Sequence, residues 1–141
     1  MDKRRLFSTL YIVFFVSLFI LLCVSKKVIS ADWTFIGQAE NNDSWYYDAD
    51  NINFLPNNII RVWAKHIPNE DAALRYAYSL LLYEVNCKDN TLTILAVMDY
   101  NDDDELIYSV QPAKPAPDYI VSDSIGYIFH KTICSLKDLK K

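Results

Sequence analysis

The chain has 141 residues, with 14 Lys and Arg against 18 Asp and Glu, which gives a formal net charge of −4 at pH 7. This length allows one domain and excludes a multidomain enzyme or a long repeat array. Only 2 glycines are present, which excludes a glycine-rich phosphate loop or a dinucleotide fingerprint. The acidic balance argues against nucleic acid as a partner, because binding to phosphates depends on clustered Lys and Arg.

The first 31 residues differ in composition from the rest of the chain. A basic start is followed by nineteen uncharged residues, 6–24, and by a short polar stretch that ends in Ser30 and Ala31. This order is typical of an export signal. As a helix, the uncharged run would extend roughly 28 Å, so an uncleaved membrane anchor is the alternative. Both interpretations place residue 32 onward outside the cytoplasm, in the periplasm, in the cell envelope or in the medium.

Cys23 falls within the uncharged run, which leaves Cys87 and Cys134 in the exported part. An even number of cysteines in an oxidising compartment predicts one disulfide, and two buried free thiols are the alternative. His66 and His130 are the only histidines. We expect no metal site and no cofactor.

Residues 32–141 carry 9 basic and 17 acidic residues, a net charge of −8, and they are rich in β-prone runs. The expected strands are residues 32–37, 44–48, 60–65, 78–87, 91–100 and 106–110. Because short polar turns join consecutive runs, we expect antiparallel pairing.

Two helices are expected. A short one lies between residues 68 and 76, where Asn69 can cap its start. A longer one follows the prolines of residues 112–117, since apolar residues recur at helical spacing over 125–133, and Ser or Asp at 122–124 can cap it. The predicted fold is α+β: a small meandering antiparallel sheet of about six strands, with the C-terminal helix packed on one face and tied by the disulfide.

The acidic residues do not indicate a catalytic or metal site. We expect the pairs Asp48/Asp50 and Asp103/Glu105 to lie on solvated surface. A calcium loop beginning at Asp99 would need a later Gly and Glu that the chain does not supply. No nucleophile elbow is present either, so we predict that the protein is not an enzyme.

Aromatic residues concentrate in the expected strands. Neighbouring side chains of a strand point to opposite faces, so Trp45, Tyr46 and Tyr47 cannot all be buried on the helix side. Packing within the sheet is one interpretation of these rings. The functional alternative is an exposed aromatic face for a protein partner or a second copy of the chain, since Trp and Tyr are frequent in interface hot spots. The candidate interface residues are Trp45, Tyr46, Tyr47 and Trp63.

Six segments of the chain follow one another in the order found in a known family. They are residues 32–37, 46–52, 60–65, 83–88, 99–100 and 119–134. In order, spacing and paired cysteines they resemble the bacterial surface-adhesin protein E family. The resemblance implies a small antiparallel sheet whose C-terminal helix is tied back by a disulfide. It also implies a cell-envelope protein that binds host extracellular-matrix proteins and can dimerise.

The sequence therefore predicts three parts: residues 1–31 as signal peptide or anchor, residues 32–134 as a protein E-like domain, and residues 135–141 as a short basic tail. The predicted function is that of an exported, non-enzymatic cell-envelope protein that acts by protein–protein binding. The alternative is a periplasmic domain that binds a small molecule or a lipid between helix and sheet. A large apolar cavity under the helix would favour that alternative.

Overall fold

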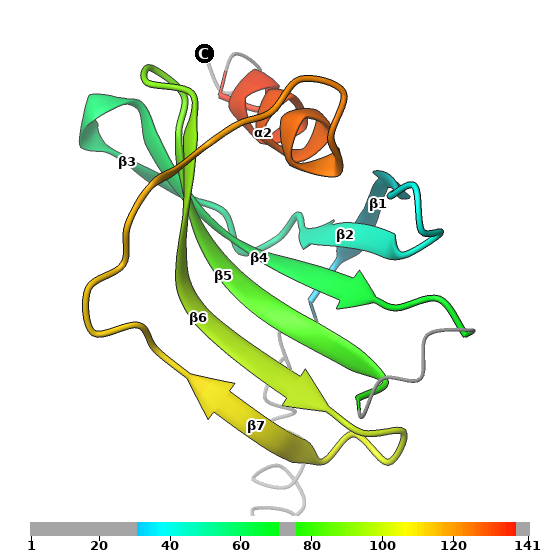
Figure 1. Cartoon of the computed structure of the whole chain (residues 1–141). Helices are drawn as coiled ribbons and strands as arrows, with labels where there is room; N and C mark the ends of the chain where they lie inside the picture. The colour runs from blue at the N-terminus through cyan, green and yellow to red at the C-terminus, as the bar shows by residue number, and fades with distance from the viewer. Residues whose placement is uncertain (1–30, 71–75, 138–141) are drawn as a thin grey trace, which may run out of the picture. The chain divides into compact units, whose positions relative to one another are not determined.

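The computed structural model describes residues 31–70 and 76–137, which belong to one compact unit. These residues form an antiparallel sheet of eight strands with a single α-helix, α2, on one face (Figure 1). The expected signal or anchor up to residue 30, most of the short helix expected between residues 68 and 76, and residues 138–141 of the tail lie outside the described residues. Within the described ranges, no helix is long and apolar enough to cross a membrane.

The sheet follows the order β1-β2-β4-β5-β6-β7, so most neighbours in sequence are neighbours in space. Its main strands are β1 (Trp33–Gln38), β2 (Ser44–Asp48), β4 (Ile59–Ile67), β5 (Tyr78–Asn86), β6 (Thr91–Tyr100) and β7 (Leu106–Val110). Two short strands extend it: β3 (Asn53–Leu55) pairs with β4, and β8 (Asp118–Tyr119) pairs with β6. The predicted fold class is confirmed, but the sheet has eight strands rather than about six. Strands of two or three residues are too short to show a period.

Helix α2 (Ile125–Ser135) begins where the apolar spacing predicts. Of the three expected caps, Ser124 is the one used: its Oγ accepts a hydrogen bond of 3.1 Å from the backbone N–H of Tyr127. Figure 1 shows α2 over one end of the sheet, with β7 along the edge farther from it. The helix is therefore fixed at its start by a cap and along its length by the core.

The core lies between α2 and the sheet, and its buried members are Tyr47, Ile60, Val62, Ala64, Val85, Phe129 and Ile133. Because β4 contributes alternate residues to this core, Arg61 and Trp63 between them point to the opposite face. We call the side that carries α2 the helix face and the opposite side the outer face. Residues paired directly across antiparallel strands share a face, so the register assigns every strand position to one of the two.

The turn between β6 and β7 contains the acidic run. The side-chain Oδ1 of Asn101 accepts hydrogen bonds from the backbone N–H groups of Asp103 and Glu105, at 3.1 and 2.8 Å. Asp104 adopts a left-handed backbone conformation with φ of 60°. This acidic segment is thus a hairpin turn stabilised by Asn101, with Asp103 and Glu105 exposed as expected.

Candidate functional site

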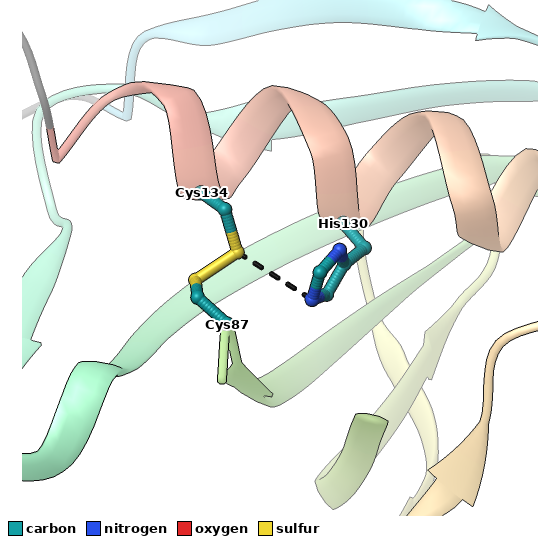
Figure 2. Close-up of side chains that lie close together, drawn as sticks. All are labelled: Cys87, His130 and Cys134. Carbon is teal, nitrogen blue, oxygen red and sulfur yellow. Dashed lines mark hydrogen bonds between the residues drawn. A yellow bond between two sulfur atoms is a disulfide. The ribbon is translucent and has the colours of Figure 1, made fainter. Parts of the chain in front are cut away.

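The structure confirms the disulfide between Cys87 and Cys134. The Cα atoms of the two residues lie 5.7 Å apart, and the bond joins the end of β5 to the last turn of α2. His130 lies beside the bond, with its Nε2 3.5 Å from the Sγ of Cys134 and 3.2 Å from the carbonyl oxygen of Asn86 (Figure 2). The disulfide therefore anchors α2 to the β5–β6 hairpin, and a buried imidazole covers it.

The four candidate interface aromatics divide between the two faces. Tyr47 is 7% exposed and belongs to the core. Trp45 also lies on the helix face, where it packs against the core and contacts the ring of His66 in a tilted arrangement, with ring centroids 4.6 Å apart. Tyr46 and Trp63 lie on the outer face, because their strand neighbours face α2. Only the latter two are placed to meet a partner on a surface that α2 does not cover.

The outer face carries aromatic rings on five strands, which we call the aromatic surface. Its members are Trp33, Phe35, Tyr46, Trp63, Tyr78 and Tyr100. The Nζ of Lys65 lies near its centre, 4.1 Å from the ring of Tyr78 and 6.0 Å from that of Trp33. Both distances fall within the range of cation–π attraction. Alternation places Tyr46 opposite its neighbours Trp45 and Tyr47, and the pairing of Tyr46 with Lys65 puts both residues on the outer face, since Tyr47 belongs to the core.

Ring–ring contacts are found at both ends of the aromatic surface, at β1 and β2 and at β5 and β6. Phe35 meets Tyr46 edge to face, with ring centroids 5.3 Å apart, and Tyr78 stacks on Tyr100 at 4.9 Å. Burial and the hydrogen bond to Asp104 raise the pKa of Tyr78 to about 12. Phe35 is 55% exposed, so the end of the surface at β1 is open to solvent.

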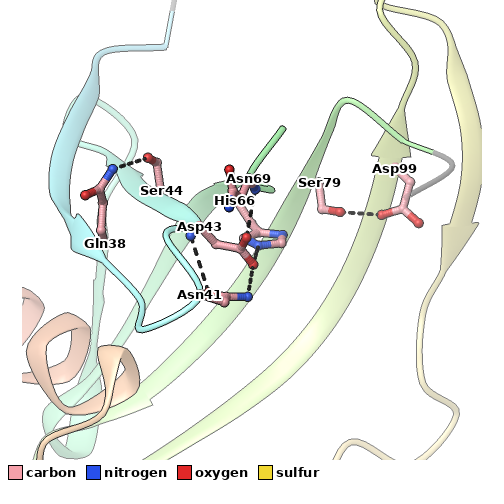
Figure 3. Close-up of polar contacts among 8 residues, drawn as sticks. All are labelled: Gln38, Asn41, Asp43, Ser44, His66, Asn69, Ser79 and Asp99. Carbon is pink, nitrogen blue, oxygen red and sulfur yellow. Dashed lines mark hydrogen bonds and ion pairs between the residues drawn. The ribbon is translucent and has the colours of Figure 1, made fainter. Parts of the chain in front are cut away.

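A polar cluster at Asp43 fixes the β1–β2 turn, and sequence reasoning missed it. The carboxylate of Asp43 accepts hydrogen bonds of 2.8 Å from the side chain of Asn41, from Nε2 of His66 and from the backbone N–H of Asn69 (Figure 3). Burial of Asp43 acts to raise its pKa, but these hydrogen bonds outweigh it and the pKa lies below its usual 3.8. The cluster joins the turn to the end of β4 and thereby holds His66 against Trp45.

Polar contacts continue along the helix face beyond His66. The hydroxyl of Ser79 donates a hydrogen bond of 2.6 Å to Asp99 on β6 (Figure 3). Burial raises the pKa of Tyr76, a hydrogen bond with Ser79 opposes this, and the charges of Asp99 and Asp43 add to the rise. Tyr76 is therefore held as a neutral hydroxyl near these carboxylates.

Asp48 corrects the expectation that the pair Asp48/Asp50 lies on solvated surface. Asp50 is exposed, but Asp48 is only 4% exposed. Its carboxylate accepts hydrogen bonds from the backbone N–H groups of Asp32 and Asp50 and from the side chain of Asn51, at 3.3, 3.2 and 2.7 Å. This carboxylate thus shapes the turn that follows β2, because buried polar groups need partners.

Two hollows bear on the alternative of a ligand pocket. The one between α2 and the sheet holds about 50 Å³ and is lined by Trp45, Tyr83, Leu92, Ile125, Gly126 and Phe129. Sites for small molecules usually measure roughly 300–1,000 Å³, so this space is too small for a lipid chain. A hollow of about 570 Å³ opens between the β1–β2 turn and the start of α2, and most of its lining residues are polar.

Comparison with known proteins agrees with this architecture. A structure of Haemophilus influenzae protein E matches with a TM-score of 0.54 and 15% sequence identity, over 79% of this chain and 89% of that one. A second crystal form of that protein matches with a TM-score of 0.54 and 19% identity, over 80% of this chain and 98% of the other. No match is found among curated protein sequences. The model of the surface-adhesin protein E family matches residues 33–135, which span the whole sheet and α2, and so the chain belongs to the surface-adhesin protein E family.

Proposed function

We propose that this chain is an exported, non-enzymatic protein of the cell envelope that acts by binding other proteins through its aromatic surface. Membership of a surface-adhesin family supports the adhesive role. The observation that carries the proposal is the group of aromatic rings on the outer face, with Tyr46 and Trp63 among them and Phe35 open to solvent. The proposed partners are host extracellular-matrix proteins, with a second copy of the chain as a further partner.

The chemistry of the aromatic surface suits protein binding. Tyr and Trp rings offer a large contact area and lose little side-chain freedom on binding. Lys65 holds a positive charge among them, where it can meet a carboxylate or a further ring of the partner. The exported part as a whole is acidic, with a net charge of −8, which favours partners with basic surfaces.

The proposed location follows from the first part of the chain. We infer export to the periplasm, the cell envelope or the medium, with the inner membrane as the location if residues 6–24 remain as an anchor. The disulfide is consistent with an oxidising compartment. In this proposal the membrane is reached only through the N-terminal segment.

The alternative, a periplasmic domain that binds a small molecule or a lipid, has less support. The space between α2 and the sheet, about 50 Å³, is smaller than an engineered cavity that admits benzene. A polar ligand would instead have to use an open hollow, such as the one of about 570 Å³ beside the β1–β2 turn or the one of about 560 Å³ between β5, β6 and the segment of Pro115 and Pro117. The filled core and the aromatic outer face favour a binding surface over a binding pocket.

A capture experiment tests the proposed function. The oxidised fragment of residues 32–141 would be applied to immobilised extracellular-matrix proteins, and its mass in solution would be measured in parallel. We expect retention on at least one of these proteins, or a dimeric mass. A fragment that is strictly monomeric and is retained on none of them would count against a protein-binding role.

A further inference from the structure

Three side chains capable of binding a metal ion meet at the end of α2. The Sγ atoms of Cys87 and Cys134 and a ring nitrogen of His130 all lie within 4.8 Å of one another (Figure 2). His130 and Cys134 are four residues apart on the helix, so they share one face of α2, and Cys87 approaches from the end of β5. The expectation that the histidines and cysteines form no metal site overlooked this four-residue spacing.

These side chains form a ligand set of the kind that Zn²⁺ takes in proteins. Tetrahedral zinc is bound by thiolates at about 2.3 Å and by imidazole nitrogens at about 2.0–2.1 Å. Those bond lengths place a sulfur and a nitrogen ligand roughly 3.5 Å from each other. The Sγ of Cys134 and the Nε2 of His130 are 3.5 Å apart in the structure, so this pair already has the separation that a shared ion requires.

In the structure described here, however, the two sulfur atoms are bonded to each other and neither is a thiolate. We propose that the reduced protein binds one Zn²⁺ ion through Cys87, Cys134 and His130, so that the metal replaces the disulfide as the link between α2 and the sheet. The two sulfurs would separate to roughly 3.8 Å, the distance between two thiolates on one zinc ion. A fourth position on the metal would be left for water.

The exchange of the disulfide for a bound metal ion takes two steps, and a dithiol is the reductant in the first. The dithiol gives two electrons and two protons to the disulfide and is itself oxidised to a disulfide, which leaves two thiols on this chain. Binding of Zn²⁺ then releases the two thiol protons to solvent, because the metal takes thiolates as ligands. Reduction therefore breaks the covalent link between α2 and the sheet, and metal binding joins the two again.

His130 is suited to serve both forms. In the oxidised form its Nε2 lies 3.2 Å from the carbonyl oxygen of Asn86, so it can donate a hydrogen bond there. To bind the metal, Nε2 must present its lone pair and the proton must move to Nδ1, as in other histidine ligands. The residue is 8% exposed, so the metal would be held in an enclosed site beneath the helix end.

Cobalt(II) provides a direct probe of this site. The whole protein, as exported, would be reduced with a phosphine without oxygen and titrated with Co²⁺. We expect thiolate-to-cobalt charge-transfer absorption and the visible bands of tetrahedral cobalt, saturating at one ion per chain and removed by added Zn²⁺. The oxidised protein should show none of these bands.

Substitutions locate the bound ion. His130→Gln should weaken Co²⁺ binding at least tenfold, whereas His66→Gln, which changes the histidine held by Asp43, should leave it unchanged. Circular dichroism would report whether α2 survives in each variant. Absence of the charge-transfer bands in the reduced wild-type protein, whether folded or unfolded, would overturn the proposal. So would equal affinities of His130→Gln and the wild type.

Discussion

Among single residues, Asp43 is notable for hydrogen bonds to a segment that is distant in sequence. It is 8% exposed and accepts hydrogen bonds from His66 and Asn69, which lie 23 and 26 residues further along the chain. An asparagine has one oxygen acceptor in place of two, so Asp43→Asn leaves at least one of these donors without its acceptor. We expect Asp43→Asn to lower the free energy of unfolding by about 1–3 kcal/mol, measured by urea denaturation at neutral pH. Asp50→Asn, at an exposed position in the next turn, is the control and should change it by less than about 0.5 kcal/mol.

The same carboxylate gives the protein an acid-sensitive component of stability. The pKa of Asp43 in the folded protein lies below 3.8, the value expected in the unfolded chain. Its contribution is therefore present above that value and is lost as pH falls through the lower folded pKa. We expect the urea concentration at the unfolding midpoint to decrease when the pH is lowered below about 4. This decrease should be less steep in Asp43→Asn. Parallel pH profiles for the two proteins would contradict this assignment.

Tyr83 provides the corresponding effect in alkali. Its burial against Phe129, with ring centroids 5.1 Å apart, and the nearby charge of Asp118 raise its pKa to about 12. Because the folded pKa lies above the unfolded value near 10, the neutral ring stabilises the fold below about pH 10 and this contribution is lost as pH rises towards 12. Spectrophotometric titration should therefore count one tyrosine fewer ionising near pH 12 in Tyr83→Phe than in the wild type. The control is Tyr119→Phe at a position 84% exposed, which should retain that tyrosine.

At the level of elements, α2 depends on its cap and on its covalent link. Ser124 accepts the hydrogen bond from Tyr127 at the first turn. Ser124→Ala should lower the free energy of unfolding by about 1 kcal/mol, as for other N-caps. Ser122 was an equally good cap on sequence grounds, but the helix begins after Ser124. Ser122→Ala should therefore change stability little, and a larger loss in this variant would contradict the cap assignment.

The disulfide closes a long segment of chain, since its cysteines are separated by 47 positions. The loss of chain entropy in the unfolded state predicts a stabilisation on the order of 4 kcal/mol. Replacing both Cys87 and Cys134 with Ala should lower the free energy of unfolding by about this amount, measured by urea denaturation without metal. An unchanged midpoint would mean that packing of α2 alone holds the helix.

The strands show which structural features the sequence determines. The expected strands 91–100 and 106–110 coincide with β6 and β7, because their β-prone residues are bounded by clear turn signals. The short strands β3 and β8 could not be predicted in this way. They form by backbone pairing with β4 and β6, and that pairing depends on tertiary contacts rather than on local side-chain pattern.

The candidate site was predictable only in part, for a similar reason. Alternation required that the rings of residues 45–47 lie on both faces, but it could not say which face α2 would cover. That choice follows from the packing of Phe129 and Ile133 against β4 and β5. Asp43 resembled any loop acid in the sequence, because its partners His66 and Asn69 lie in a distant segment. Lys65 likewise joins the aromatic surface only through the register of the sheet.

At the level of the whole molecule, the two faces of the sheet have different roles. The helix face buries the core and is closed by α2, its cap and its disulfide. The outer face presents aromatic rings and one central lysine across five strands. We therefore propose that the helix face supports stability and the outer face supports binding, in a member of the surface-adhesin protein E family.

The measurement that tests this assignment most directly is the dissociation constant for a captured partner, compared between variants of the outer face and of α2. Tyr46→Ala and Trp63→Ala remove rings from the aromatic surface, whereas Tyr127→Ala removes a ring of α2 that is 41% exposed. For variants that unfold at the same urea concentration as the wild type, we expect the outer-face changes to weaken binding more than tenfold, as at hot spots, and Tyr127→Ala to leave it unchanged. Unchanged affinity in Tyr46→Ala and Trp63→Ala, or an equal loss in Tyr127→Ala, would contradict it.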